Sequence, residues 1–292
     1  MSEAQDIDVL ILGGEAMHPG SRALNHAAVP ELYTALNGHM ICFGTGDGRV
    51  NLVYPFMGRV LIGSTDIEID DPDAAVCDRQ ETDYLRGVVA EIFPDLPVTE
   101  TQIRSRFSGV RPLPRADGDV AEVTRDHSIA ELSLPSGTPV LCLIGGKWTT
   151  FRGFSEQAAD RVLDLLGHAR RRGTAQMQIG GGKGYPAPFE RASWIARRSS
   201  ETGVPEPRIE LLLSRYGTRA ASIAAELGAD EPLGSLPTYS REELLWLIDN
   251  ERVGSVDDLL RRRTDIAISG SLSEAVREEV SSLFEVGRSA VA

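Results

Sequence analysis

The sequence contains little cysteine and no long hydrophobic run. Its three cysteines, Cys42, Cys77 and Cys142, lie far apart and in no C-x-x-C spacing, so neither a disulfide framework nor a paired-cysteine site is predicted. We expect three reduced, buried thiols. No apolar stretch approaches the length of a membrane span, and the first residues, MSEAQDID, are acidic, unlike a signal peptide. These absences predict a cytoplasmic protein and leave open peripheral attachment to the inner face of the cell membrane.

Positive charge is also scarce. The chain has 30 lysines and arginines against 43 aspartates and glutamates, which gives a formal net charge of -13. Because phosphate contacts need clustered cations, this balance argues against nucleic acid as a partner. The five histidines do not cluster with acidic residues at metal-ligand spacing, so no metal site is predicted. Nothing resembles a Ser-His-Asp arrangement or a P-loop.

A dinucleotide-binding fingerprint is missing as well. That fingerprint is G-x-G-x-x-G between a strand and a helix. Here the apolar run IDVLIL ends at Gly13 and Gly14, but the chain continues as EAMHP, which fails the pattern. Residues 1–36 are therefore left unassigned, as a segment too short for a nucleotide-binding domain.

Short strand patterns follow from Gly38 onward. HMICFG and VNLVYPFM flank Asp47-Gly48, and RVLIGSTDIEI follows Met57-Gly58; both dipeptides are hairpin signals. Apolar residues at helical spacing in DDPDAAVCDRQETDYLRGVVAEIF then predict an amphipathic helix. QIRSRFSGVRPLP and EVTRDHSIAEL are expected to form a further strand pair around the turn RADGDVA. Together these patterns predict an antiparallel sheet with a flanking helix.

A strand, a glycine turn and a helix follow one another around LIGGKWTTF. The run PVLCLI predicts a buried strand, and FRGFSEQAADRVLDLLG predicts a helix that Thr149 or Thr150 caps. Glycine lets a ligand approach such a turn closely, and the helix N-terminus favours an anion or an electron-rich ring. From this stretch alone, the alternative is a plain tight turn with a surface lysine.

The remaining chain is helical in pattern. Residues 169–187 form a linker by composition, and residues 188–292 contain only helical segments, several with serine, threonine or proline near the start. The predicted fold class is α+β: an antiparallel sheet region at 37–168, followed by an all-helical C-terminal domain.

Four segments carry a resemblance to a known family. GRVNLVYPFMGRVLIGSTD, SGVRPLP, TRDHSI and GGKWTTFR occur in this order, and together they resemble the second half of the FAD-dependent glycerol-3-phosphate dehydrogenases, flavoproteins of the DAO type. YGTRAASIA and EELLWLIDNERVGSVDDLLRRRTDIAI resemble that family's C-terminal domain. The resemblance covers roughly residues 38–290. It implies a partial FAD- and substrate-binding domain at 37–168, FAD as cofactor, and oxidation of glycerol 3-phosphate to dihydroxyacetone phosphate. Erythritol-phosphate dehydrogenases are near relatives, so another polyol phosphate is the alternative.

The resemblance also implies functional residues. Arg111 in SGVRPLP matches the family arginine that holds substrate, and Lys147 in GGKWTTFR matches the lysine at the flavin; these two are the catalytic candidates. Arg125 in TRDHSI matches an arginine near the substrate phosphate. The implied cofactor contacts are Gly109, Gly145, Gly146, Lys147, Trp148 and Thr149. The competing interpretations are structural ion pairs for the arginines, a solvated turn lysine, and a turn cap for Asp66 in GSTD.

The sequence departs from the family at its start. Family members begin with the G-x-G-x-x-G domain that binds the ADP part of FAD, and this sequence lacks the fingerprint. Three explanations are open: a truncated gene product, a split enzyme whose separate second chain carries the Rossmann domain, or part of a longer protein. The expected partners are a polyol phosphate, a quinone or another electron acceptor, and that separate chain in the second case. A noncatalytic remnant or assembly module is the competing hypothesis, and apolar surface normally covered by the absent half is expected to be exposed.

Overall fold

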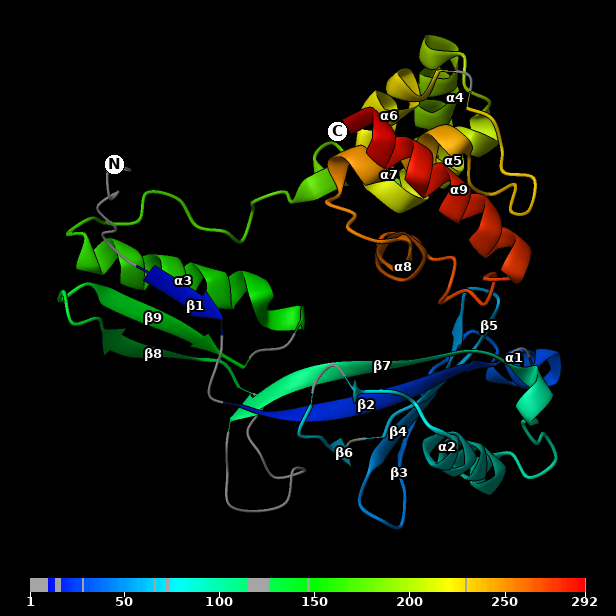
Figure 1. Cartoon of the computed structure of the whole chain (residues 1–292), viewed down its shortest axis with the longest axis horizontal. Coiled ribbons are helices and arrows are strands. Elements are labelled where there is room, and N and C mark those ends of the chain that lie inside the picture. The colour runs from blue at the N-terminus through cyan, green and yellow to red at the C-terminus, as the bar shows by residue number, and fades with distance from the viewer. Residues whose placement is uncertain are drawn as a thin grey trace. The chain divides into compact units, whose positions relative to one another are not determined.

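The chain folds into two compact units, residues 1–177 and 178–292 (Figure 1). The computed structural model describes residues 10–13, 17–27, 29–65, 67–71, 74–114, 126–145, 148–228 and 230–291. The division between the units falls inside the stretch 169–187, whose composition is that of a linker.

The larger sheet of the first unit is antiparallel. Its strands are β2 (Met17–Ala27), β3 (Ile41–Gly44), β4 (Val50–Phe56), β5 (Arg59–Gly63), β6 (Ile67–Glu68) and β7 (Ile103–Pro114). Their order is β3-β4-β5-β2-β6, with β7 paired along the length of β2. The sheet therefore joins strands that are far apart in the sequence.

Both predicted hairpins in this sheet are confirmed. β3 pairs with β4 across the turn at Asp47-Gly48, where Gly48 has φ +80°. β4 pairs with β5 across Met57-Gly58, and both turn residues have positive φ, +50° and +72°. Two consecutive left-handed residues match the twist of the flanking strands, which explains why the connection is so short.

The predicted pairing of QIRSRFSGVRPLP with EVTRDHSIAEL is wrong. The first segment forms β7 and pairs with β2, with Met17 opposite Pro114 and Gly20 opposite Arg111. The second contributes β8 (Ser128–Ser133), which lies in a different sheet. β2 was not predicted because MHPGSRALNHA contains proline, glycine and two histidines, and its strand conformation depends on pairing with distant residues.

Two helices cover one face of the larger sheet. α1 (Pro30–Leu36) follows β2, and α2 (Arg79–Ile92) begins in a capping box in which Asp78 accepts from the Glu81 N–H at 2.8 Å. The short turn η2 (Glu100–Gln102) precedes β7. The buried residues that join these helices to the sheet are Val29, Leu32, Leu36, Val53, Val60, Ile62, Leu85, Val89 and Val98. The predicted amphipathic helix is confirmed.

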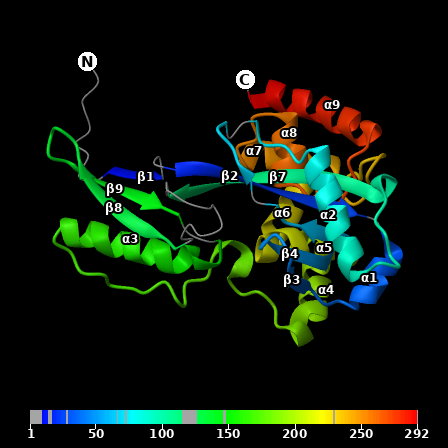
Figure 2. The same ribbon diagram turned by 90° about the horizontal axis from the view of Figure 1, so that it is seen from below.

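A smaller sheet completes the first unit (Figure 2). Its strands are β1 (Leu10–Gly13), β8 (Ser128–Ser133) and β9 (Pro139–Ile144), in the order β1-β9-β8, with β1 parallel to β9. The turn η4 (Trp148–Thr150) leads from β9 into α3 (Phe151–Leu165), which lies along this sheet. The predicted strand and helix on either side of the glycine turn are confirmed. Thr150 occupies the N-cap position, but its side chain makes no capping hydrogen bond.

None of the three cysteines forms a disulfide in the structure, and the prediction that they are buried is wrong. Cys42 is exposed, and Cys77 and Cys142 are partly exposed. Cys42 lies on β3, an edge strand of the larger sheet, so only one of its neighbouring positions in the sheet is occupied.

The second unit consists of helices joined by loops, with one isolated β-bridge between Pro232 and Ser240 among its described residues. The helices are α4 (Arg191–Thr202), α5 (Glu206–Tyr216), α6 (Ala220–Leu227), α7 (Arg241–Asn250), α8 (Val256–Asp258) and α9 (Glu274–Val291). Short 3-10 turns are η5 (Gly180–Gly182), η6 (Pro188–Glu190) and η7 (Gly217–Arg219), and the π-helical segment η8 (Leu259–Arg263) follows α8. Together with the antiparallel strands of the first unit, these helices confirm the α+β prediction.

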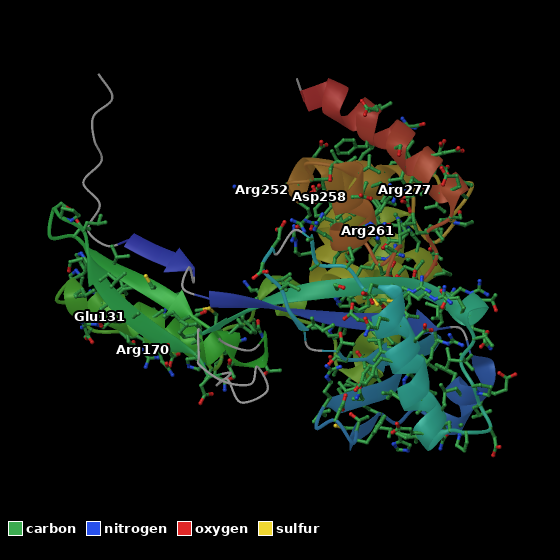
Figure 3. All side chains as sticks on the ribbon, turned by 60° about the horizontal axis from the view of Figure 1, so that its bottom comes forward. Glu131, Arg170, Arg252, Asp258, Arg261 and Arg277 are labelled. Carbon is green, nitrogen blue, oxygen red and sulfur yellow. The ribbon has the colours of Figure 1, made fainter. Side chains whose placement is uncertain are left out.

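Two apolar clusters form the core of the second unit. One joins α4, α5 and α6, and the other joins α7, η8 and α9. Tyr216 and Trp246 pack against both clusters, with their rings in an edge-on contact at 5.9 Å. At the surface, Asp257 accepts hydrogen bonds from Arg261 and Arg277, which ties the α8 segment to α9. Figure 3 labels the side chains of Arg261 and Arg277. Among the helices that the structure describes, none combines the length and apolar character that a membrane crossing requires.

Candidate functional site

β7 carries two of the predicted functional residues, Gly109 and Arg111. Their backbones pair with Arg22 and Gly20 of β2. Arg106, three residues before Gly109, donates from Nε to Thr82 Oγ1 of α2 at 3.1 Å. Since side chains alternate along a strand, Arg106 faces α2 and position 109 belongs to the opposite face of the sheet.

Gly109 leaves that face of the sheet open. The residue is exposed, and a Cβ atom added to it would meet no heavy atom within 4 Å. The structure itself therefore does not require glycine here. A flat group that approaches the strand backbone would require it, which is the property that a flavin ring needs.

Gly145 is required by the fold itself. It follows β9 with φ +68°, and a Cβ atom added to it would lie 2.7 Å from the carbonyl oxygen of Asp126. Both the left-handed backbone and the close approach to residue 126 demand glycine. The plain tight turn, which the sequence left as the alternative, therefore explains Gly145 without a ligand.

Replacing Gly145 by alanine should destabilise the first unit. The added methyl group collides with backbone and fixes an unfavourable φ, so we expect the free energy of unfolding to fall by roughly 1–3 kcal/mol. Urea unfolding followed by circular dichroism measures the change. Gly109→Ala is the matched control, because its methyl group enters open space, and it should change stability by less than about 0.5 kcal/mol. Equal destabilisation by the two substitutions would contradict the assignment.

The helix after this turn is held against β8 by side chains from both elements. The ring of His127 lies 4.4 Å from that of Phe154, and His127 Nε2 is 3.2 Å from Gln157 Oε1. Arg161 donates to both carboxylate oxygens of Glu131, with Nη2 to Oε2 at 2.7 Å, and this hydrogen bond lowers the pKa of Glu131 below its ordinary value. His127, the histidine inside a family-like motif, thus positions α3.

The structure brings near one another two strands that carry or precede predicted residues. β7 contacts β9, so the strand that carries Gly109 and Arg111 neighbours the strand that leads into Gly145. Trp148 and Thr149 follow in η4, at the start of α3. Asp66, Arg125, Gly146 and Lys147 lie outside the described residues. Within the described part of the chain, no three histidine, cysteine, aspartate or glutamate residues form a group that could hold a metal ion.

The open face of the larger sheet carries two aromatic residues that sequence reasoning did not select. Val53, Val60 and Ile62 pack toward α2, so Tyr54 and Phe56 of β4 lie on the same face as Gly109. Their ring centroids are 6.3 Å apart in an edge-on arrangement, and burial raises the pKa of the Tyr54 hydroxyl. The signal was present in the alternation of NLVYPF, which places Val53 and Tyr54 on opposite faces.

Comparisons with known proteins match both units of the chain. Residues 22–152 match the family of FAD-dependent oxidoreductases, and residues 172–286 match the C-terminal domain of alpha-glycerophosphate oxidase. A glycerol-3-phosphate dehydrogenase of Synechocystis sp. is 32% identical over 238 residues, which cover 76% of this chain and 41% of that protein. A D-erythritol 1-phosphate dehydrogenase of Brucella abortus is 29% identical over 245 residues, which cover 82% of this chain and 48% of that protein.

A solved structure shares the fold. The glycerol-3-phosphate dehydrogenase from Bacillus halodurans, complexed with FAD, aligns with a TM-score of 0.68 at 22% identity, over 93% of this chain and 54% of that chain. The chain spans about half the length of the curated relatives that it matches. The two matched regions show that the chain belongs to the family of FAD-dependent oxidoreductases that includes the glycerol-3-phosphate dehydrogenases.

Proposed function

We propose that this chain forms the substrate-side part of an FAD-dependent dehydrogenase that oxidises glycerol 3-phosphate to dihydroxyacetone phosphate. The observation that carries the proposal is the open backbone at Gly109, two residues before Arg111, on a strand that neighbours the β9 turn. In this reaction the secondary alcohol loses a hydride from carbon and a proton from oxygen, and a carbonyl forms. FAD supplies the hydride acceptor.

The proposed roles of the chain's residues follow from their chemistry. Arg111 holds the substrate, because a guanidinium donates two parallel hydrogen bonds to a phosphate or to the developing carbonyl oxygen. Arg125 adds positive charge at the phosphate end. Lys147, which lies between Gly146 and Trp148 in the sequence, would stabilise negative charge on the flavin. Gly109 would let the strand pass close to the ring, and Gly145, Gly146, Trp148 and Thr149 would contribute backbone donors and contacts to it.

A second polyol phosphate is a specific alternative substrate. The 29% identity to the Brucella abortus protein named D-erythritol 1-phosphate dehydrogenase is close to the 32% identity to the Synechocystis protein. Both substrates share a phosphate and a secondary alcohol, so the proposed arginines suit either one. A quinone or another acceptor is the proposed destination of the electrons, with the protein in the cytoplasm or at the inner face of the membrane.

We also propose that a separate polypeptide with the G-x-G-x-x-G fingerprint binds the ADP part of FAD. Family members bind the ADP part of FAD with a domain whose fingerprint this sequence lacks. In addition, β8, the turn after it and α3 expose apolar side chains. Leu132 is 59% exposed, Phe151 45% and Leu134 43%. Exposed apolar residues on neighbouring elements suit a surface that another polypeptide covers.

The test of the proposed function is the visible absorbance spectrum of the purified chain, before and after addition of FAD and gel filtration. The same measurement is made after co-expression with the portion of the Synechocystis relative that this chain does not match. We expect flavin absorbance to co-elute with the chain in at least one preparation. Gly109→Ala should reduce the retained flavin without changing stability. Absence of flavin from both preparations would refute the proposal.

In the flavin-containing preparation, Arg111→Ala and Lys147→Ala should lower kcat/KM for glycerol 3-phosphate by roughly 100-fold each, because each removes a charge-assisted contact made at the reacting centre. Turnover with glycerol 3-phosphate and with erythritol phosphate is measured by dye reduction. Arg79→Ala is the control, since the Arg79 side chain is 93% exposed on α2. Unchanged turnover by both active-site variants would remove them from the mechanism.

A further inference from the structure

Two arginines of the larger sheet, the partly buried Arg59 and the exposed Arg104, have no protein partner for their charge among the described residues. Neither makes a hydrogen bond or an ion pair to any described residue, and the Nη1 atom of Arg59 is buried without a hydrogen-bond acceptor. Other arginines of the same unit are paired: Arg49 with Asp47, and Arg86 with Asp83. A buried N–H group without an acceptor is uncommon in folded proteins and calls for an explanation.

The strand register brings the two arginines to neighbouring strands. Arg59 is the first residue of β5 and Arg104 is the second of β7, and both strands flank β2. Ala27 of β2 pairs with Val60 on one side and with Ile103 on the other. Each arginine is therefore adjacent in sequence to a residue that pairs with Ala27.

A β-bulge in β7 sets the direction of Arg104. In the pairing of β2 with β7, His26 lies opposite Ser105 and the next residue, Ala27, lies opposite Ile103. Arg104 is therefore the extra residue of β7. Ile103 packs against the core beneath α2, and Arg106 also reaches α2. Regular alternation cannot place residues three apart on one face, so the bulge supplies the extra position.

Both arginines consequently leave the same face of the sheet. Val60 is part of the core under α2, so its neighbour Arg59 points to the other face, and the same holds for Arg104 next to Ile103. Burial, and then the nearby positive charge of Arg104, lower the pKa of the Arg59 guanidinium. Two like charges thus project from neighbouring strands on one face of the sheet.

We propose that Arg59 and Arg104 form a binding site for a phosphate group. Two guanidinium groups present several N–H donors from two directions, and a phosphate dianion has enough terminal oxygens and enough charge to satisfy both. A carboxylate has two oxygens and one charge, so it would leave one cation uncompensated. The ligand is inorganic phosphate or a phosphate monoester.

This site is distinct from the proposed active site. Arg104 and Gly109 are five residues apart on β7, which corresponds to about 16 Å along an extended strand. The site therefore depends neither on flavin nor on Arg111, and its test does not depend on the proposed function.

Thermal unfolding of the full chain in phosphate and in chloride buffers of equal ionic strength tests the proposal. We expect phosphate to raise Tm by about 3 °C relative to chloride, and Arg59→Gln or Arg104→Gln to abolish that rise. Arg79→Gln on α2 is the control and should keep it. Methyl phosphate, added in place of inorganic phosphate, shows whether the site also accepts an ester.

A second measurement separates ligand binding from a structural role. In chloride, Arg59→Gln should leave Tm unchanged or raise it, because it removes repulsion between two cations. A lower Tm for Arg59→Gln in chloride would mean that the arginine stabilises the fold, and a phosphate effect that persists in both variants would place the anion elsewhere. Either result would overturn the proposal.

Discussion

Replacing Glu243 by glutamine should destabilise the helical unit, residues 178–292, by about 3–5 kcal/mol. Glu243 is fully buried in α7 and accepts hydrogen bonds from Arg208 Nη2 at 2.8 Å, Arg215 Nη1 at 3.0 Å and Tyr216 Oη at 2.6 Å. Asp230 also pairs with Arg208, but Arg215 has no second carboxylate partner among the described residues. The neutral amide would leave a buried guanidinium uncompensated.

The hydrogen bonds to Glu243 also predict that the helical unit loses stability at alkaline pH. Burial, and then the Glu243 carboxylate, raise the pKa of Tyr216 far above its ordinary value. The folded state therefore keeps the Tyr216 phenol neutral, whereas in the unfolded chain this phenol ionises at about pH 10. The contribution of Tyr216 to the free energy of unfolding is therefore present below about pH 10 and is lost as the pH rises above that value. Urea unfolding at several pH values measures both effects.

Tryptophan fluorescence reports the unfolding of the helical unit, because Trp194 and Trp246 lie in it. Glu278→Gln is the matched control: it makes the same chemical change on α9, where the side chain is exposed, and it should alter stability by less than about 0.5 kcal/mol. If Glu243→Gln matched this control, the buried charges would have to be satisfied in some other way.

The sequence predicted those parts of the fold whose signals are local. Asp47-Gly48 and Met57-Gly58 predicted two hairpins, because a residue with positive φ, Gly48 in one turn and both Met57 and Gly58 in the other, favours a short turn. The α2 helix is set by its apolar spacing and by the capping box at Asp78. Serine at the N-cap of α7 acts in the same way, since Ser240 accepts from the Glu243 N–H at 3.0 Å.

The pairings that failed depend on distant residues. β2 and β7 are about eighty positions apart, and no local pattern in MHPGSRALNHA predicts that this segment pairs with the strand of Phe107 and Gly109. Once β2 occupies one edge of β7, EVTRDHSIAEL pairs elsewhere, with β9. The bulge at Arg104 arises from the same pairing, which is why the juxtaposition of Arg104 with Arg59 could not be predicted from either segment.

For the site, the sequence identified candidate glycines but did not show why each position is glycine. Gly109 and Gly145 both occur in family-like motifs, yet only Gly145 meets its own chain at a distance that forbids a side chain. Local sequence does not distinguish a glycine required by backbone packing from one that leaves room for a ligand. The distinction needs the position of Asp126, which precedes the neighbouring strand β8.

Replacing Gly217 by alanine should lower the free energy of unfolding of the helical unit by about 3 kcal/mol or more. Gly217 follows α5 with φ +60° and ψ -145°, a region that only glycine adopts readily. An added Cβ atom would lie 2.4 Å from the carbonyl oxygen of Gly181, so backbone strain and a steric collision act together. Gly181→Ala should have a similar effect, since its Cβ atom would lie 2.1 Å from the Tyr216 carbonyl oxygen.

This contact fixes the chain where it enters the helical unit. Thr218 Oγ1 lies within hydrogen-bond distance of the carbonyl oxygens of Gly181, at 3.0 Å, and Lys183, at 2.8 Å, beside the same pair of glycines. On the other side of the boundary, Arg152 of α3 donates to the carbonyl oxygen of Met177 at 2.8 Å. Composition alone assigned this stretch to a linker, whereas its glycines permit two backbones to touch.

Gly182→Ala provides the matched control, because Gly182 has no heavy atom within 4 Å of an added Cβ and no positive φ. It should leave unfolding within about 0.5 kcal/mol of the wild type, and limited proteolysis near residue 181 should accelerate only in Gly181→Ala and Gly217→Ala. If Gly217→Ala unfolded like Gly182→Ala, the two backbones would not be in contact in solution, and residues 180–183 would be a free linker. The difference in the free energy of unfolding between Gly217→Ala and Gly182→Ala therefore decides whether the helical unit begins at the contact with Gly217 or only at α4.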